Sequence, residues 1–213
     1  MPKTFLHVGC GSKQKKNTTP EFANSDWIEV RLDIDASHAP DVIGTMTDMS
    51  SVASGSVDAV FSSHNIEHLY PHEVPAALAE FKRVLNPQGI AVITCPDLRS
   101  VCRLVADDKL TDTAYQSPAG PIAAIDIIYG HRLSMASGNL FMAHRCGFTE
   151  AALNRTLRLA GFQTVGTISR GFAPFYDLWA VASVANRSEA QMRDLASLHF
   201  PKTAFDGRDR ALP

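Results

Sequence analysis

Short runs of apolar residues alternate with polar stretches along the first half of the chain, and such runs predict β-strands. They cover residues 4–8, 27–35, 41–44, 56–63 and 90–95. Before the last run, residues 73–85 repeat apolar side chains at helical spacing, so an amphipathic helix is expected there. "NPQG" at 86–89 predicts a turn between that helix and the strand that follows.

The second half has a weaker pattern. Residues 97–109 predict a helix, whereas 110–147 are expected to be irregular, with proline and glycine around one apolar segment. A helix at 149–160 follows, with Thr149 as its N-cap and Gly161 as its stop. Two strands near 162–169 and 177–185 precede a polar helix and tail.

Strands that alternate with helices predict an α/β fold with a mainly parallel sheet and helices on both faces. In such sheets, ligands bind beyond the carboxyl ends of the strands. A length of 213 residues favours a single domain over residues 1–213. The irregular segment at 110–147 is expected to be an insertion on the ligand side of that domain.

Charge and cysteine content indicate which partners and which cellular compartment are expected for the protein. The net charge of −2 and the 20% of charged residues argue against electrostatic docking on nucleic acid or on an anionic membrane. No apolar leader or membrane-length run is found. The four cysteines lack the spacing of a disulfide framework or metal site and predict free thiols in a cytoplasmic protein.

The stretch "FLHVGCGSKQ" at 5–14 ends a predicted strand on two glycines, Gly9 and Gly11. Glycines there let the backbone approach a ligand closely, and Asp33 ends the next predicted strand, where a carboxylate accepts ribose hydroxyls. Together they predict a nucleoside-containing cofactor. An NAD-dependent oxidoreductase would need a third glycine where the chain has Gln14, so that alternative fits less well.

Five segments resemble, in order, the motifs of class I S-adenosylmethionine-dependent methyltransferases, in their small methyltransferase-domain-11-like branch. They are "LHVGCGS", "RLDID", "SGSVDAVFSSHNIEHL", "EFKRVLNPQGIAVITCPD" and "HRCGFTEAALNRTLRLAGF". The resemblance implies a Rossmann-like fold with a seven-stranded sheet. It also implies methyl transfer from S-adenosylmethionine, with S-adenosylhomocysteine as the product.

The resemblance also implies the cofactor contacts. The loop under the methionine part of the cofactor corresponds to Gly9, Cys10 and Gly11, and the ribose contact corresponds to Asp33. The surroundings of adenine correspond to Ile34, Thr45, Met46 and Thr47. The surroundings of the sulfonium correspond to Ser63 and His64. His7 stands where the family usually has an acid near the cofactor ammonium, and Thr45 also replaces an acid. These two departures keep open a catalytically inactive module that binds cofactor or a protein partner.

The segment "HNIEH" after the fourth predicted strand offers the acid–base chemistry. His64 is the first candidate for a general base, since imidazole titrates near neutral pH, and His68 is the second. The favoured interpretation assigns no metal. Two alternatives remain, in which Glu67 and His68 brace the next helix, or Glu67, His68 and His64 hold a divalent ion, as in some methyltransferases with "ExxEH" at this place.

The insertion is expected to cover the methyl acceptor. Its candidate substrate contacts are Tyr129, His131, His144 and Arg145. The predicted reaction is methyl transfer to an oxygen or nitrogen atom of a small molecule, with no nucleic-acid or membrane partner.

Overall fold

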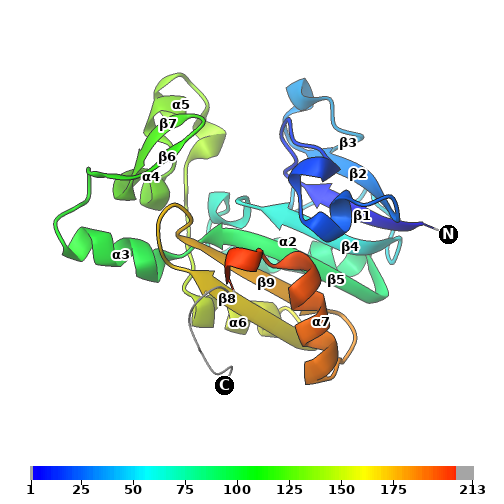
Figure 1. The fold of residues 1–213 in the computed structure, drawn as a ribbon. Helices are drawn as coiled ribbons and strands as arrows, with labels where there is room; N and C mark the ends of the chain where they lie inside the picture. The colour runs from blue at the N-terminus through cyan, green and yellow to red at the C-terminus, as the bar shows by residue number, and fades with distance from the viewer. Residues whose placement is uncertain (1, 205–213) are drawn as a thin grey trace.

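The computed structural model describes residues 2–204 and places a seven-stranded sheet at the centre of the molecule (Figure 1). The strand order is β3-β2-β1-β4-β5-β9-β8. The strands are β1 (Lys3–Val8), β2 (Trp27–Asp33), β3 (Val42–Ile43), β4 (Val57–Ser63), β5 (Leu85–Pro96), β8 (Thr164–Arg170) and β9 (Asp177–Ser183). β1 to β5 pair in parallel, whereas β9 is antiparallel to both β5 and β8. The mainly parallel α/β sheet is confirmed.

Helices cover both faces of this sheet, because the alternation within each strand sends apolar side chains to both sides. The α-helices are α1 (Pro20–Ala23), α2 (Val74–Val84), α3 (Leu98–Ala106), α4 (Ala124–Tyr129), α5 (Arg132–Ala136), α6 (Glu150–Leu159) and α7 (Glu189–His199). Leu6 and Val8 of β1 belong to a core shared with α2 and α6, whereas Phe5 belongs to a second core shared with α1 and α7 (Figure 1).

Local signals explain where the long helices begin. Thr149 accepts a hydrogen bond from the backbone N–H of Ala152 and so caps α6, as predicted. Ser188 caps α7 in the same way. The 3-10 helices are η1 (Lys15–Asn17), η2 (Ala36–His38), η3 (Ile66–His68), η4 (Leu140–Met142) and η5 (Lys202–Ala204).

The turn predicted at 86–89 is wrong. α2 passes at Val84 directly into β5, which begins at Leu85. Leu85 pairs with Val57 and Ile90 with Ala59, so the residues between them form a bulge inside the strand. Proline and glycine indicated an interruption correctly, but pairing with β4 resumes on both sides of it.

The irregular structure predicted for 110–147 is also wrong. This segment contains the hairpin of β6 (Thr113–Ser117) and β7 (Gly120–Ala123), followed by α4, α5 and η4. Ile122 and Ile127 pack with Val101 of α3 in a small core of their own. In Figure 1, this insertion stands beside the carboxyl ends of the central strands.

No helix among residues 2–204 is long and apolar enough to cross a membrane. The polar helix predicted near the C-terminus is α7, and the predicted tail at 205–213 lies outside the described residues.

Candidate active site

The loop after β1 carries both glycines in the left-handed region of backbone conformation, with φ of +62° at Gly9 and +52° at Gly11. A Cβ atom at Gly9 would lie 2.3 Å from Oδ1 of Asn65, whereas one at Gly11 would meet no atom within 4 Å. The loop is therefore packed tightly against the segment after β4 at Gly9 and open at Gly11.

Asp33, at the end of β2, is joined directly to this loop. Its Oδ2 accepts the backbone N–H of Gly11 at 2.7 Å, and its Oδ1 accepts that of Asp35 at 2.9 Å. Each carboxylate oxygen has a second lone pair for another donor, such as a ribose hydroxyl. Ile34 follows with half of its surface exposed. The predicted pairing of glycine loop and acid is thus present in the fold.

Arg31 organises the same region and was missed by the sequence analysis. Its guanidinium donates to the carbonyl oxygens of Gly11 at 2.6 Å, Lys13 at 3.1 Å and Ala39 at 3.0 Å. It therefore ties the glycine loop to the loop after β2. Among residues 2–204, the acceptors of this guanidinium are backbone carbonyls. Every residue has a carbonyl, so no residue type in the sequence indicates this role.

His7 is buried on β1, with its Nδ1 2.7 Å from Oε1 of Glu29 on β2. Burial lowers the pKa of His7 despite the raising effect of Glu29, so the neutral imidazole donates Nδ1–H to the carboxylate. The other oxygen of Glu29 accepts the backbone N–H of Lys15 at 2.8 Å. His7 therefore supports the segment after the glycine loop, and its contact with a cofactor ammonium stays a prediction.

The remaining predicted cofactor residues lie in turns beside the loop. Thr45 Oγ1 is 3.1 Å from Thr47 Oγ1 and accepts the backbone N–H of Asp48, which closes the turn after β3. Met46 packs partly buried against the core shared with α2. Burial raises the pKa of the Cys10 thiol to about 11, so that side chain is protonated. A contact between Cys10 and a cofactor would therefore be made by its backbone.

The chain after β4 adopts an unusual conformation at His64. This residue has φ of +54°, a region that side chains other than glycine rarely occupy and that is often found at functional sites. Its imidazole is 45% exposed. Next to it, Asn65 donates its amide N–H to the carbonyls of Val8 at 3.0 Å and Ser63 at 3.1 Å, a contact that the sequence analysis missed.

Glu67 lies beneath His64 with only 1% of its surface exposed. His64 Nδ1 is 3.4 Å from Glu67 Oε1, a charge contact too long for a good hydrogen bond. Burial lowers the pKa of His64, but the nearby carboxylate of Glu67 outweighs this effect and leaves that pKa raised. Neither oxygen of Glu67 has a hydrogen-bond partner among residues 2–204.

The insertion returns to the sheet beside this carboxylate. The backbone N–H of Arg145 donates to the carbonyl oxygen of Glu67 at 2.8 Å, and the Arg145 guanidinium donates to that of His68 at 2.9 Å. The ring of His144 meets that of His68 edge-to-face, with ring centroids 4.9 Å apart. Two of the predicted acceptor contacts therefore meet the "HNIEH" segment in space.

The other two acceptor candidates lie further along the insertion. Tyr129 is 61% exposed, and its carbonyl oxygen accepts the backbone N–H of His144 at 3.1 Å. His131 Nδ1 is 2.8 Å from Ser134 Oγ, within the turn that begins α5. Their roles as substrate contacts stay predictions.

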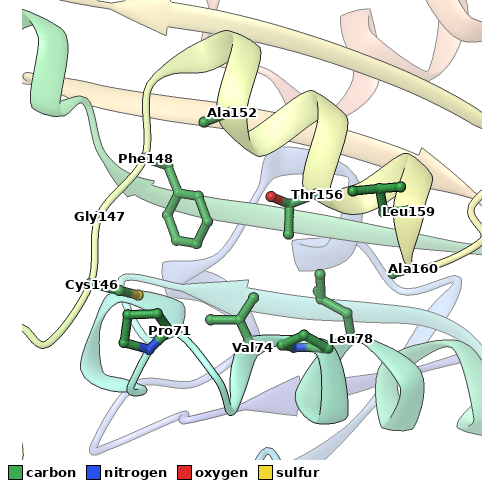
Figure 2. A pocket seen from close by; sticks show the side chains of 11 residues that line it. Pro71, Val74, Leu78, Cys146, Gly147, Phe148, Ala152, Thr156, Leu159 and Ala160 are labelled. Carbon is green, nitrogen blue, oxygen red and sulfur yellow. The ribbon is translucent and has the colours of Figure 1, made fainter.

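A separate apolar pocket of about 510 Å³ lies between α2 and α6 (Figure 2). Val74, Leu78 and Phe148 point into it. The residues that line this pocket include none of the predicted cofactor or catalytic residues. We therefore place the candidate active site at the carboxyl ends of β1, β2 and β4, and not at this pocket.

A glycine loop hydrogen-bonded to an acid at the end of the second strand, in a sheet of this order with one antiparallel strand near its edge, defines a class I methyltransferase fold. Residues 6–93 match the family model described as a methyltransferase domain. Residues 6–93 are thus similar to a methyltransferase domain, and the comparisons support S-adenosylmethionine-dependent methyl transfer.

Solved structures share the fold at low sequence identity. A Burkholderia thailandensis 1,6-didemethyltoxoflavin-N1-methyltransferase, solved with S-adenosylhomocysteine, is 17% identical with a TM-score of 0.53, over 85% of this chain and 71% of that one. A Methanosarcina mazei S-adenosylmethionine-dependent methyltransferase is 16% identical with a TM-score of 0.57, over 87% and 94%. No curated protein matches the chain. None of the comparisons supports the oxidoreductase alternative.

Proposed function

We propose that the enzyme methylates an oxygen or nitrogen atom of a small-molecule acceptor, with His64 as general base. The observation that carries this proposal is the pair of His64, exposed and in a left-handed conformation, and Glu67, buried beneath it. A base held by a buried carboxylate at the edge of the cofactor loop suits an acceptor that must lose a proton, such as a hydroxyl group.

The cofactor loop fits S-adenosylmethionine, which supplies an activated methyl group when bound. Open space beside Gly11 admits a ligand close to the backbone, and the unused lone pairs of Asp33 accept hydroxyl groups. The surroundings of the sulfonium would be Ser63, whose hydroxyl is held 2.9 Å from that of Thr94, and the backbone of His64.

On the acceptor side, Nδ1 of His64 faces Glu67, so Nε2 is the nitrogen that remains to take a proton. Glu67 orients the ring and stabilises the imidazolium that forms. His68 is the second candidate for a catalytic role, and its Nδ1 is held 3.1 Å from the carbonyl oxygen of Ala143. The exposed Tyr129 and Arg145 are the acceptor contacts that we propose from the insertion.

The free cysteines favour a cytoplasmic location, where thiols stay reduced.

The cofactor site is tested by calorimetric titration of Asp33→Asn with S-adenosylhomocysteine. Loss of a charge-assisted hydrogen bond is expected to weaken binding by about 10- to 100-fold. Asp58→Asn is the matched control, because Asp58 also accepts a backbone N–H, that of Thr4 at 2.8 Å near the opposite ends of the strands. Equal affinity in both variants would contradict the assignment of Asp33.

The base is tested by His64→Gln in a turnover assay with a panel of small alcohols, phenols and amines. The turnover number is expected to fall by about 100-fold or more on hydroxyl acceptors, while affinity for S-adenosylhomocysteine stays within a factor of two or so. His72→Gln, in the same surface segment, is expected to keep full turnover. A wild-type protein that binds the cofactor but methylates none of the panel would overturn the proposed acceptor class.

A further inference from the structure

The Glu67 carboxylate is unusual because it is buried and yet accepts no hydrogen bond from the residues that the structure describes. Its oxygens make no hydrogen bond with any described residue, and the closest cationic group is the half-exposed imidazole of His64 at 3.4 Å. A buried carboxylate without hydrogen bonds is strongly unfavourable unless a cation compensates its charge. The surroundings of Glu67 therefore point to a positive charge that the side chains alone supply poorly.

Two histidines beside Glu67 are held in a defined tautomer. His68 Nδ1 lies 3.1 Å from the carbonyl oxygen of Ala143, and His144 Nδ1 lies 2.8 Å from that of Ile127. A carbonyl oxygen only accepts hydrogen bonds, so Nδ1 carries the proton in both rings. In the neutral rings, each Nε2 then has a lone pair to donate. Histidines that ligate metals are held in this way by a backbone carbonyl.

The three side chains also converge in space. One ligand atom from each of Glu67, His68 and His144 lies within 4.8 Å of the others. Ligands at about 2.0–2.2 Å from a single ion lie at most about 4.4 Å from one another. Small side-chain rotations would therefore suffice to close the cluster around an ion.

We propose that Glu67, His68 and His144 form a binding site for one divalent transition-metal ion, with Zn²⁺ as the best-matched species. Two imidazole nitrogens and one carboxylate oxygen suit zinc or iron better than magnesium or calcium, which prefer oxygen ligands only. The site differs from the alternative drawn from "HNIEH" alone, because His144 of the insertion replaces His64 as the third ligand. His64 remains available as a base.

Both sides of the site are fixed to the backbone of the fold. The backbone N–H groups of Arg145 and Cys146 donate to the carbonyl oxygen of Glu67 at 2.8 and 3.2 Å. The ion would thus join the segment after β4 to the end of the insertion. This inference rests on the three side chains and does not depend on the proposed acceptor or base.

The test is titration of the full-length, chelator-treated protein with Zn²⁺ by calorimetry and with Co²⁺ by visible absorption. The wild type is expected to bind one ion per chain. Bound Co²⁺ is expected to show the visible d–d absorption bands of a low-symmetry coordination site. Glu67→Gln and His144→Ala are each expected to weaken binding by about 100-fold. His72→Ala is the matched control, since His72 is exposed in the same segment and stacks on Tyr70.

Circular dichroism and titration with S-adenosylhomocysteine show whether each variant is folded. A folded Glu67→Gln variant that has lost Zn²⁺ but keeps S-adenosylhomocysteine supports the site. The inference is overturned if the wild type binds no stoichiometric ion. It is equally overturned if Glu67→Gln binds Zn²⁺ as tightly as His72→Ala, which would mean that Glu67 is compensated by protonated histidines alone.

Discussion

At Gly9, backbone conformation and packing both exclude a side chain. Its φ is +62°, and Asn65, held by the carbonyls of Val8 and Ser63, lies where a Cβ atom would be. Gly55 has a similar φ of +68°, but a Cβ atom there would meet nothing within 4 Å. A comparison of alanine substitutions at these two positions therefore distinguishes the cost of left-handed backbone strain from the cost of steric overlap.

Gly9→Ala is expected to lower the free energy of unfolding more than Gly55→Ala. Left-handed strain alone accounts for about 1–2 kcal/mol at either position. Displacement of Asn65 from its two carbonyls adds about 1–3 kcal/mol at Gly9 only. Urea unfolding of both variants measures the difference, and equal destabilisation would show that Asn65 moves aside without losing its hydrogen bonds.

Glycines with special backbone conformations and charged residues at strand ends are the parts of the candidate site that the sequence predicts. Gly9, Gly11 and Asp33 were named from the sequence because a glycine pair and an acid follow adjacent predicted strands. Arg31 and Asn65 were not, because each binds carbonyl oxygens, which every residue has. The pairing of His7 with Glu29 was missed for another reason, since it depends on the register of β1 against β2.

At the scale of elements, His199 joins α7 to the N-terminal part of the chain. Its Nδ1 is 3.1 Å from Thr19 Oγ1, and its ring centroid is 4.5 Å from that of Phe22 in α1. Only 1% of its surface is exposed, and burial lowers the pKa of His199 to about 4. The folded protein therefore holds this imidazole neutral under conditions in which the unfolded chain protonates it.

This burial makes the stability of the protein dependent on pH. The folded pKa lies below the unfolded value near 6.5, so the contribution of His199 is complete above pH 6.5 and is lost as pH falls towards 4. Between pH 7 and 4.5, the loss is expected to be about 2–3 kcal/mol. Urea unfolding of the wild type and of His199→Gln measures it.

His199→Gln is expected to lack this part of the acid destabilisation, whereas His38→Gln, at a half-exposed histidine, is expected to retain it. If His199→Gln loses as much stability as the wild type over this range, burial of His199 is not the source of the effect.

Elements with a strong periodic pattern were the predictable ones. The apolar run at 90–95 and the helical repeat at 73–85 became β5 and α2, because burial on two faces or on one stripe requires those patterns. The hairpin of β6 and β7 escaped prediction. Its strands are short, and apolar residues of the hairpin pack on the small core around Val101, so the alternation of apolar and polar residues is weak.

At the scale of the whole molecule, sequence patterns determined the class of fold and the glycine loop with its acid. These properties depend on interactions within a few residues or between consecutive strands. Tertiary structure alone decided that Glu67 is buried, that His144 returns to it from the end of the insertion, and that Arg31 spans two loops. Such contacts join residues far apart in the chain, and their geometry follows from strand register and loop closure, which leave no local pattern in the sequence.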